Sequence, residues 1–127
     1  MTKDNFDMLS NHILDMVKNT RDSGQNEYAR DTEDVLANFK RIGSWKNESQ
    51  ESVLLTYLLK HIDGISSFVN GHKSQREDVR GRITDAIVYL FLLWAMIDGN
   101  KELDAIKEPL IKTYQEKFHN GKTESLL

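Results

Sequence analysis

The sequence predicts an all-α protein, a single domain over residues 1–127 folded as a bundle of about five helices. Helix-breaking residues are scarce, because the chain has only seven glycines and one proline, about half of their usual share. Apolar side chains recur at intervals of three and four residues, as they do on the buried face of a helix. No segment alternates apolar and polar residues as a half-buried strand does, so we expect no sheet.

The first half of the chain contains two predicted helices separated by a polar loop. The first helix covers about residues 4–19, and the loop covers 19–30. The second helix begins at Asp31 or Thr32, because either side chain can accept a hydrogen bond at a helix N-terminus, and it ends at Gly43. The apolar residues that repeat in these two helices are Phe6, Leu9, Ile13, Met16 and Val17, followed by Val35, Leu36, Phe39 and Ile42.

A third helix is predicted over about residues 50–70, with Asn47 or Ser49 as its N-cap. The pair Asn70-Gly71 is a typical helix stop. One stripe of side chains along this helix is almost wholly apolar and predicts the face that packs in the core. Its members are Leu54, Leu58, His61, Ile65 and Phe68.

A central apolar helix is predicted over about residues 76–97. Ser74 and Glu77 have the spacing of a capping box, in which each side chain binds the other residue's backbone N–H. The run Ala86–Ile97 is apolar nearly all round, yet it is shorter than the roughly 20 residues that cross a bilayer. Such a helix lies in the middle of a bundle or is covered by a second subunit, so we expect a homo-oligomer.

The C-terminal part of the chain predicts a fifth helix. The signal Asp98-Gly99-Asn100 ends the preceding helix, and the fifth covers about residues 101–119. Pro109 lies inside this range and should kink the helix or start a new turn, since proline lacks the N–H that a helix needs. Residues 120–127 are expected to fray.

Composition excludes several classes of function. The chain has no cysteine, which excludes disulfides, thiolate zinc sites and a cysteine nucleophile. The formal net charge of −3 argues against generic binding of duplex nucleic acid. The N-terminus lacks the apolar segment of a signal peptide, so we expect a cytoplasmic protein without a membrane partner, in a host cytoplasm if a phage encodes it.

One face of the predicted central helix carries polar side chains. Asp78, Arg82, Asp85 and Tyr89 follow one another at helical spacing. Asp85 stands where the helix becomes apolar, and a buried carboxylate needs a cation, a metal ion or a hydrogen-bond donor. On these residues alone, a structural Asp78–Arg82–Asp85 ladder is the simpler interpretation, and a Mg²⁺ or phosphate site at Asp85 is the alternative.

The predicted third helix adds two candidates beside each other. Lys60 can bind a phosphate or pair with Asp85. His61 lies on the apolar stripe, where a histidine is more often a hydrogen-bonded core residue than a ligand. The polar stretch 21–31 can fold over a ligand or simply connect two helices.

Four short motifs follow one another along residues 20–97. They are Gln25-Asn26-Glu27-Tyr28-Ala29-Arg30, the pair Asn38-Phe39, a helix with Lys60, and a helix in which Glu77, Asp85 and Tyr89 fall on a four-residue repeat. Together they resemble the nucleotide-modification-associated domain, a small all-helical family common in bacteriophage genomes. That family is similar in outline to MazG-like nucleoside triphosphate pyrophosphohydrolases. Gly81 stands where the family pattern has an aspartate.

The resemblance implies a phage-type protein that handles nucleotides. In MazG-like enzymes, carboxylates on two helices hold Mg²⁺ against a nucleoside triphosphate, which implies Glu77 and Asp85 as metal ligands. It also implies five contacts with the nucleotide, namely Asn26, Glu27, Tyr28, Lys60 and Tyr89.

Three functions stay open at this point. The chain is a Mg²⁺-dependent pyrophosphohydrolase or a nucleotide-binding derivative of one, and Gly81 weakens the case for catalysis. It is alternatively a non-enzymatic accessory or counter-defence protein that sequesters a nucleotide signal or binds a host protein. In the third interpretation, it is a helical oligomer whose polar stripes are only structural.

Overall fold

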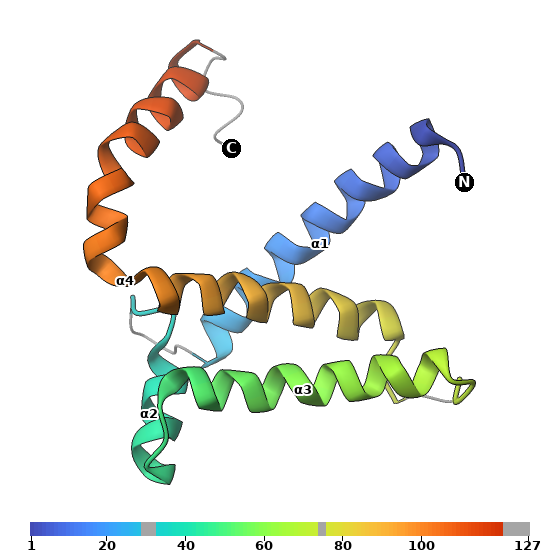
Figure 1. Ribbon diagram of the computed structural model, residues 1–127. Helices are drawn as coiled ribbons and strands as arrows, with labels where there is room; N and C mark the ends of the chain where they lie inside the picture. The colour runs from blue at the N-terminus through green and yellow to red at the C-terminus, as the bar shows by residue number, and fades with distance from the viewer. Residues whose placement is uncertain (29–32, 74–75, 121–127) are drawn as a thin grey trace. The chain divides into compact units, whose positions relative to one another are not determined.

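The computed structural model describes residues 1–28, 33–73 and 76–120, except for the side chains of 26, 28, 100–108, 110 and 118–120. This part of the chain is all-helical and contains no strand, as predicted (Figure 1). The helices are α1 (Lys3–Tyr28), α2 (Ala37–Lys46), α3 (Gln50–Val69) and α4 (Val79–Asn120). Because α4 is interrupted at Gly99, these described residues form five helical segments.

Helix α1 is longer than predicted. It continues to Tyr28, through most of the residues that we assigned to a loop over 19–30. Gly24 lies in the helix with nothing near the position of a Cβ atom. A glycine there costs about 1 kcal/mol relative to alanine, which weakens a helix without ending it. The predicted boundary at residue 19 is therefore wrong.

Helix α2 begins and ends later than predicted. Asp31 and Thr32 lie outside the described residues, and the helix begins at Ala37. Asp34 stabilises the turn before the helix, because its carboxylate accepts a hydrogen bond from the Leu36 N–H at 2.9 Å.

Gly43 does not end α2, contrary to the prediction, but lies inside it. The helix ends at Lys46, and Asn47 follows in the left-handed conformation (φ 56°). The Glu48 N–H then donates to the Gly43 carbonyl at 2.9 Å. The chain thus folds back over Gly43, which is buried.

Gly43→Ala is expected to destabilise the protein by about 1–3 kcal/mol, because the new methyl group overpacks this turn. A Cβ atom at Gly43 would lie 2.6 Å from the Glu48 carbonyl oxygen, which is part of the backbone. The matched control is Gly81→Ala in α4, where nothing lies within 4 Å of the new atom. Urea unfolding should show Gly81→Ala to be neutral or stabilising by up to about 1 kcal/mol. Equal effects of the two substitutions would contradict the packing argument.

Helix α3 confirms its prediction. It spans Gln50–Val69, and the Ser49 hydroxyl accepts from the Ser52 N–H at 3.1 Å, as an N-cap does. The turn after it contains Gly71 with φ 104°, a conformation that favours glycine.

Helix α4 begins at Val79, and Asp78 accepts at its first turn from the Arg80 N–H at 2.9 Å. Glu77 therefore lies just before the helix, and Ser74, its predicted capping-box partner, lies outside the described residues. The predicted stop at 98–100 is confirmed by Gly99, whose φ of 62° interrupts the helix. Pro109 lies inside α4 and does not break the helical backbone, since the residue with non-helical φ and ψ is Gly99.

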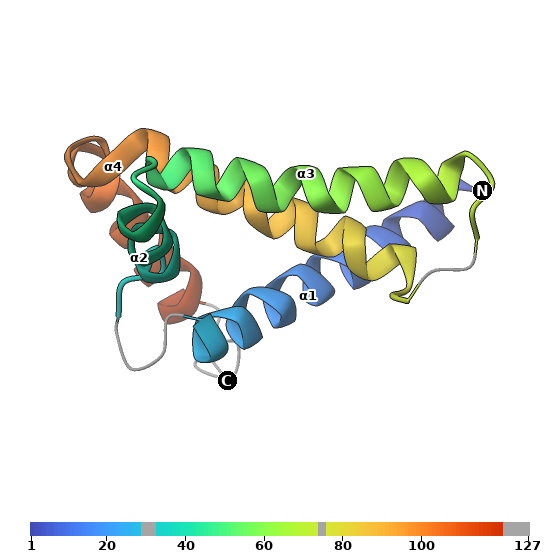
Figure 2. The ribbon, with the colours of Figure 1, turned by 90° about the horizontal axis from the view of Figure 1, so that it is seen from below.

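The chain divides into two compact units, Met1–Met96 and Ile97–Leu127. The single-domain organisation stays a prediction. In the first unit, α3 and the first part of α4 lie side by side, and α2 packs against α3 (Figures 1 and 2). The buried core cluster of this unit consists of Phe39, Val53, Leu54 and Met96.

The predicted central apolar helix is buried on one side only. In the first part of α4, Ala86 and Val88 are buried, whereas Leu90, Phe91 and Trp94 are more than half exposed. None of the described helices has the length and apolar character needed to cross a membrane.

Candidate functional site

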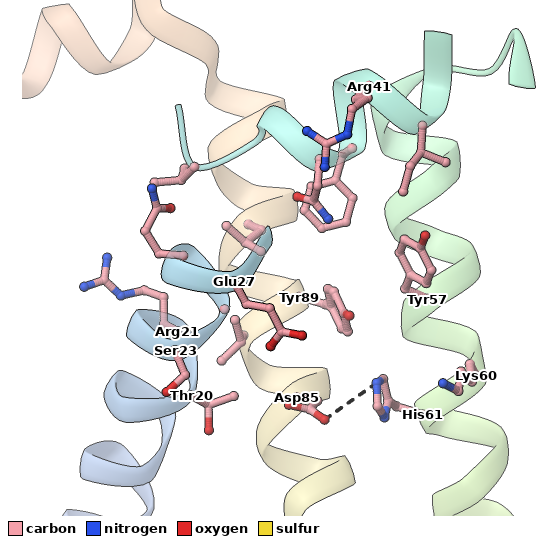
Figure 3. A pocket seen from close by; sticks show the side chains of 18 of the residues that line it. Thr20, Arg21, Ser23, Glu27, Arg41, Tyr57, Lys60, His61, Asp85 and Tyr89 are labelled. Atoms are coloured by element: carbon pink, nitrogen blue, oxygen red, sulfur yellow. Dashed lines mark ion pairs between the residues drawn. The ribbon is translucent and has the colours of Figure 1, made fainter. Parts of the chain in front are cut away.

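A cavity of about 600 Å³ opens among the four helices of the first unit (Figure 3). It combines charged, polar and aromatic walls. Its polar and charged lining is Thr20, Arg21, Ser23, Gln25, Glu27, Asn38, Arg41, Lys60, His61, Glu77 and Asp85. The apolar and aromatic lining includes Val35, Phe39, Ile42, Tyr57, Val88, Tyr89 and Leu92.

Three titratable side chains meet on one wall of this cavity. His61 on α3, Asp85 on α4 and Glu77 just before α4 each offer a ligand atom, and these atoms all lie within 4.8 Å of one another. The His61 Nε2 atom is 3.7 Å from an Asp85 carboxylate oxygen. Figure 3 shows both side chains turned toward each other across the gap between α3 and α4.

His61 differs from the hydrogen-bonded core histidine that we expected. Its side chain is only 9% exposed, but its Nδ1 atom has no hydrogen-bond partner among the described residues. Its Nε2 atom faces Asp85 at a distance longer than a hydrogen bond. The apolar stripe of α3 predicted that His61 is buried. It could also have indicated the pairing with Asp85, because the buried face of α3 is the face turned toward α4.

Asp85 lies in an unfavourable electrostatic environment. Burial raises the pKa of the Asp85 carboxyl above its ordinary value, and the nearby Glu77 carboxylate also raises it. His61, Arg82 and Lys60 oppose this shift. A carboxylate that is costly to ionise gains more from a bound cation than an exposed carboxylate does.

Asp85→Asn is therefore expected to raise the melting temperature of the metal-free protein near neutral pH. Because the folded-state pKa is raised, the favourable contribution of Asp85 is lost as the pH rises through that pKa. Asparagine cannot ionise, so the advantage of the variant should shrink as the pH falls toward 3.8, the ordinary pKa of the group. Melting curves in EDTA across this range measure it. A difference that is independent of pH would contradict this cause.

Three cationic side chains line the same cavity as the acidic cluster. Lys60 lies next to His61 on α3, Arg41 comes from α2, and Arg21, which is paired with Asp22 at 2.7 Å, comes from α1. Their positive charges suit a phosphate, which Arg binds through two N–H groups and Lys as a point charge. The same cavity thus offers both carboxylates for a cation and cations for an anion.

Aromatic rings form another wall. The rings of Tyr57 and Tyr89 are stacked, with centroids 6.2 Å apart and planes at 19°. Tyr89 also lies 5.6 Å from the His61 ring, and Phe39 packs edge-on against both tyrosines. These rings give the cavity an aromatic wall, against which a planar ring of a ligand can pack face-on or edge-on.

The structure brings together most of the residues singled out from the sequence. Glu27, Lys60, Glu77, Asp85 and Tyr89 all line the cavity. Their roles as metal ligands or nucleotide contacts stay predictions. The predicted contacts Asn26 and Tyr28 lie outside the described side chains.

The structural ladder proposed for α4 is not formed as expected. Asp78 pairs with Arg80, at 3.3 Å, rather than with Arg82. The Arg82 side chain lies instead against Gly64 of α3, where a Cβ atom would come within 2.7 Å of it. Asp85 pairs with His61.

Comparisons with protein-family models, with curated proteins and with solved structures give no match for this chain.

Proposed function

We propose that the cavity binds a nucleotide together with a divalent cation. The observation that supports this is the arrangement of its walls. The cluster of His61, Glu77 and Asp85 lies beside Lys60, and the stacked Tyr57 and Tyr89 line the same space. A nucleotide has the matching parts, since its phosphates need cations and its base needs an apolar, flat neighbour.

In this proposal, each group of cavity residues contacts a different part of the ligand. Glu77 and Asp85 hold the cation, which the resemblance implies is Mg²⁺, and Lys60 and Arg21 contact the phosphates. The base lies against Tyr89, and Glu27 contacts the ligand from α1. When bound, a divalent cation supplies neutralisation of the phosphates and activation of a water, so pyrophosphate release is the reaction that fits. We place this activity in the cytoplasm, where nucleotides are available.

Binding without turnover is the second candidate. The cluster contains three ligand residues, and Gly81, at the position where the family pattern has an aspartate, is an exposed glycine with open space around it. A protein of this kind would sequester a nucleotide signal rather than cleave it, as an accessory or counter-defence protein does.

A thermal-shift comparison tests both candidates. A ligand at about 100 times its Kd adds about 2.7 kcal/mol, which raises Tm by several degrees. We expect triphosphates to raise Tm with Mg²⁺ and less without it, and pyrophosphate release separates turnover from sequestration. Lys60→Ala should lower the nucleotide shift, whereas Lys18→Ala, on α1 and away from the cavity lining, should not. No shift with any nucleotide would overturn the proposal.

We also propose that two copies of the chain associate through α1. Phe6, Leu9, Ile13 and Met16 follow one another at intervals of three and four residues, the spacing of a two-helix seam. Each is between 37% and 48% exposed. Within the first unit, Figure 1 shows the N-terminal half of α1 extending away from α3 and from the first part of α4.

A second copy suits this seam better than an unrelated partner. Four of the residues that flank it, Asn5, Ser10, His12 and Asn19, carry no charge at neutral pH with histidine neutral. Lys3, which also flanks it, is paired with Asp7 of its own helix at 2.8 Å. Two copies can therefore face each other without like-charge repulsion, and a two-fold interface uses the same patch twice. The exposed Met8 and Leu14 beside the seam add to the apolar area.

Sedimentation of the intact chain tests the association. We expect a dimer at tens of micromolar, because an apolar seam of this kind drives helix pairing. Ile13→Asp should dissociate it, and Asn11→Asp, which lies off the seam, should not. A wild-type chain that sediments as a monomer would overturn the proposal, and the exposed seam would then be open to a host protein.

A further inference from the structure

The acidic cluster contains one nitrogen ligand, His61, and a nitrogen ligand affects which metal ion a site prefers. His61 is 7% exposed as a residue, and it points between α3 and α4 at the Asp85 carboxylate (Figure 3). Glu77 completes the group, with all ligand atoms within 4.8 Å of one another. The resemblance named only the two carboxylates.

The buried imidazole lacks the partners that a structural histidine has. Its Nδ1 atom is buried without a hydrogen bond among the described residues, and Nε2 is 3.7 Å from Asp85. Buried polar atoms are hydrogen-bonded in the great majority of cases, so an exception calls for a cause. A metal ion supplies one at Nε2, the nitrogen that faces Asp85, because a coordinate bond takes the place of the hydrogen bond that this atom does not make at 3.7 Å.

The spacing of the three side chains is close to that of a coordination shell. Ligands about 2.0–2.2 Å from a tetrahedral zinc ion are roughly 3.3–3.6 Å apart. The His61 and Asp85 atoms are 3.7 Å apart, and all three ligand atoms lie within 4.8 Å of one another. A movement of about 1 Å therefore closes the group around one ion, and rotation of the exposed Glu77 side chain can provide it.

Donor chemistry then distinguishes among the ions. Mg²⁺ prefers oxygen ligands and keeps several waters, so a buried imidazole adds little to its binding. Carboxylates suit Mg²⁺ and Mn²⁺ alike, whereas imidazole suits zinc, copper, iron and nickel, so the imidazole is the ligand that favours an ion of the first transition row. We infer that His61, Glu77 and Asp85 form a site for a first-row transition ion such as Mn²⁺ or Zn²⁺, in preference to Mg²⁺. This rests on the cation part of the proposed function and corrects the ion that the resemblance implies.

The test uses the untagged chain and metal alone, so it does not depend on nucleotide binding. Equilibrium dialysis against Mn²⁺, Zn²⁺ or Mg²⁺, followed by metal analysis, gives the stoichiometry and the affinity. We expect one transition ion per chain, bound at least 100-fold more tightly than Mg²⁺. The spectrum of the Co²⁺-loaded chain should show d–d bands that change when His61 is replaced.

His61→Gln is the decisive variant. It should weaken Zn²⁺ and Mn²⁺ binding by about 10–100-fold or more, as loss of a metal-site residue does, and leave weak Mg²⁺ binding little changed. His12→Ala removes an exposed histidine on α1 and should change neither. Circular dichroism confirms that the variants are folded, and Asp85→Asn provides a second loss of affinity if His61→Gln does not fold.

Three results would overturn the inference. They are equal affinities for Mg²⁺ and the transition ions, binding that is unaffected by both His61→Gln and Asp85→Asn, and no metal binding at all. If one of these three results were found and nucleotide with Mg²⁺ still raised Tm, the inference would fail but the proposed function would stand. Tight transition-metal binding without a nucleotide shift would support the inference and reject the nucleotide.

Discussion

Leu54→Ala is expected to destabilise the protein by about 2–5 kcal/mol, the range measured when a buried leucine is truncated and leaves a cavity. Leu54 is 0% exposed and lies with Phe39, Val53 and Met96 in the core cluster. Because a domain is stable by only about 5–15 kcal/mol in total, this change removes a large share of the free energy of unfolding. Urea unfolding followed by circular dichroism measures it.

Leu59→Ala is the matched control for this experiment. Leu59 lies on the same helix, α3, but is 55% exposed. The same chemical change there should stay within about 0.5 kcal/mol. If Leu59→Ala were as destabilising as Leu54→Ala, the exposed face of α3 would be buried in solution by another molecule or by another part of the chain.

The double variant Glu77→Gln/Asp85→Asn is expected to reverse the effect of metal on nucleotide binding. With a divalent cation, affinity should fall by 100-fold or more, because both carboxylates of the cluster lose their charge. Without metal, affinity should rise, since two negative charges beside the phosphates of the ligand are removed. Isothermal titration with and without EDTA measures both arms.

Asp63→Asn serves as the control for charge alone. Asp63 is an exposed acid on α3 and is not among the residues that line the cavity. This variant should leave both titrations unchanged. If the double variant lost nucleotide affinity equally with the divalent cation and in EDTA, the two carboxylates would be holding the structure of the cavity rather than the cation.

Sequence reasoning found the helical segments better than their ends. The stripe of α3 and the Ser49 cap are local features, and both are confirmed. The boundary of α1 was wrong because Gly24 and the polar residues around it weaken a helix without forbidding one. Gly43 was assigned to a helix end, but its role depends on the backbone of Glu48 folding back over it.

The candidate site was predictable residue by residue, but not as a set. Glu77 and Asp85 were singled out from one helix, and Lys60 from another. The approach of Glu77 and Asp85 to His61 depends on how α3 packs against α4. Periodicity specifies which face of a helix is buried, but not which helix covers it. A histidine on an apolar stripe therefore reads as a core residue until the neighbouring helix is in place.

Tyr89 belongs to the core and to the cavity at once. Its ring packs on Phe39 and Tyr57 and also lies beside His61. A substitution of Tyr89 that changes its packing against Phe39 and Tyr57 is therefore expected to shift the His61 ring as well. A substitution that alters the contact with His61 is expected to loosen the packing. If the cavity binds a ligand as proposed, ligand preference and fold stability depend on the same ring. Altered specificity is then expected to arise first at Glu27 or Arg21, which line the cavity from the exposed surface of α1.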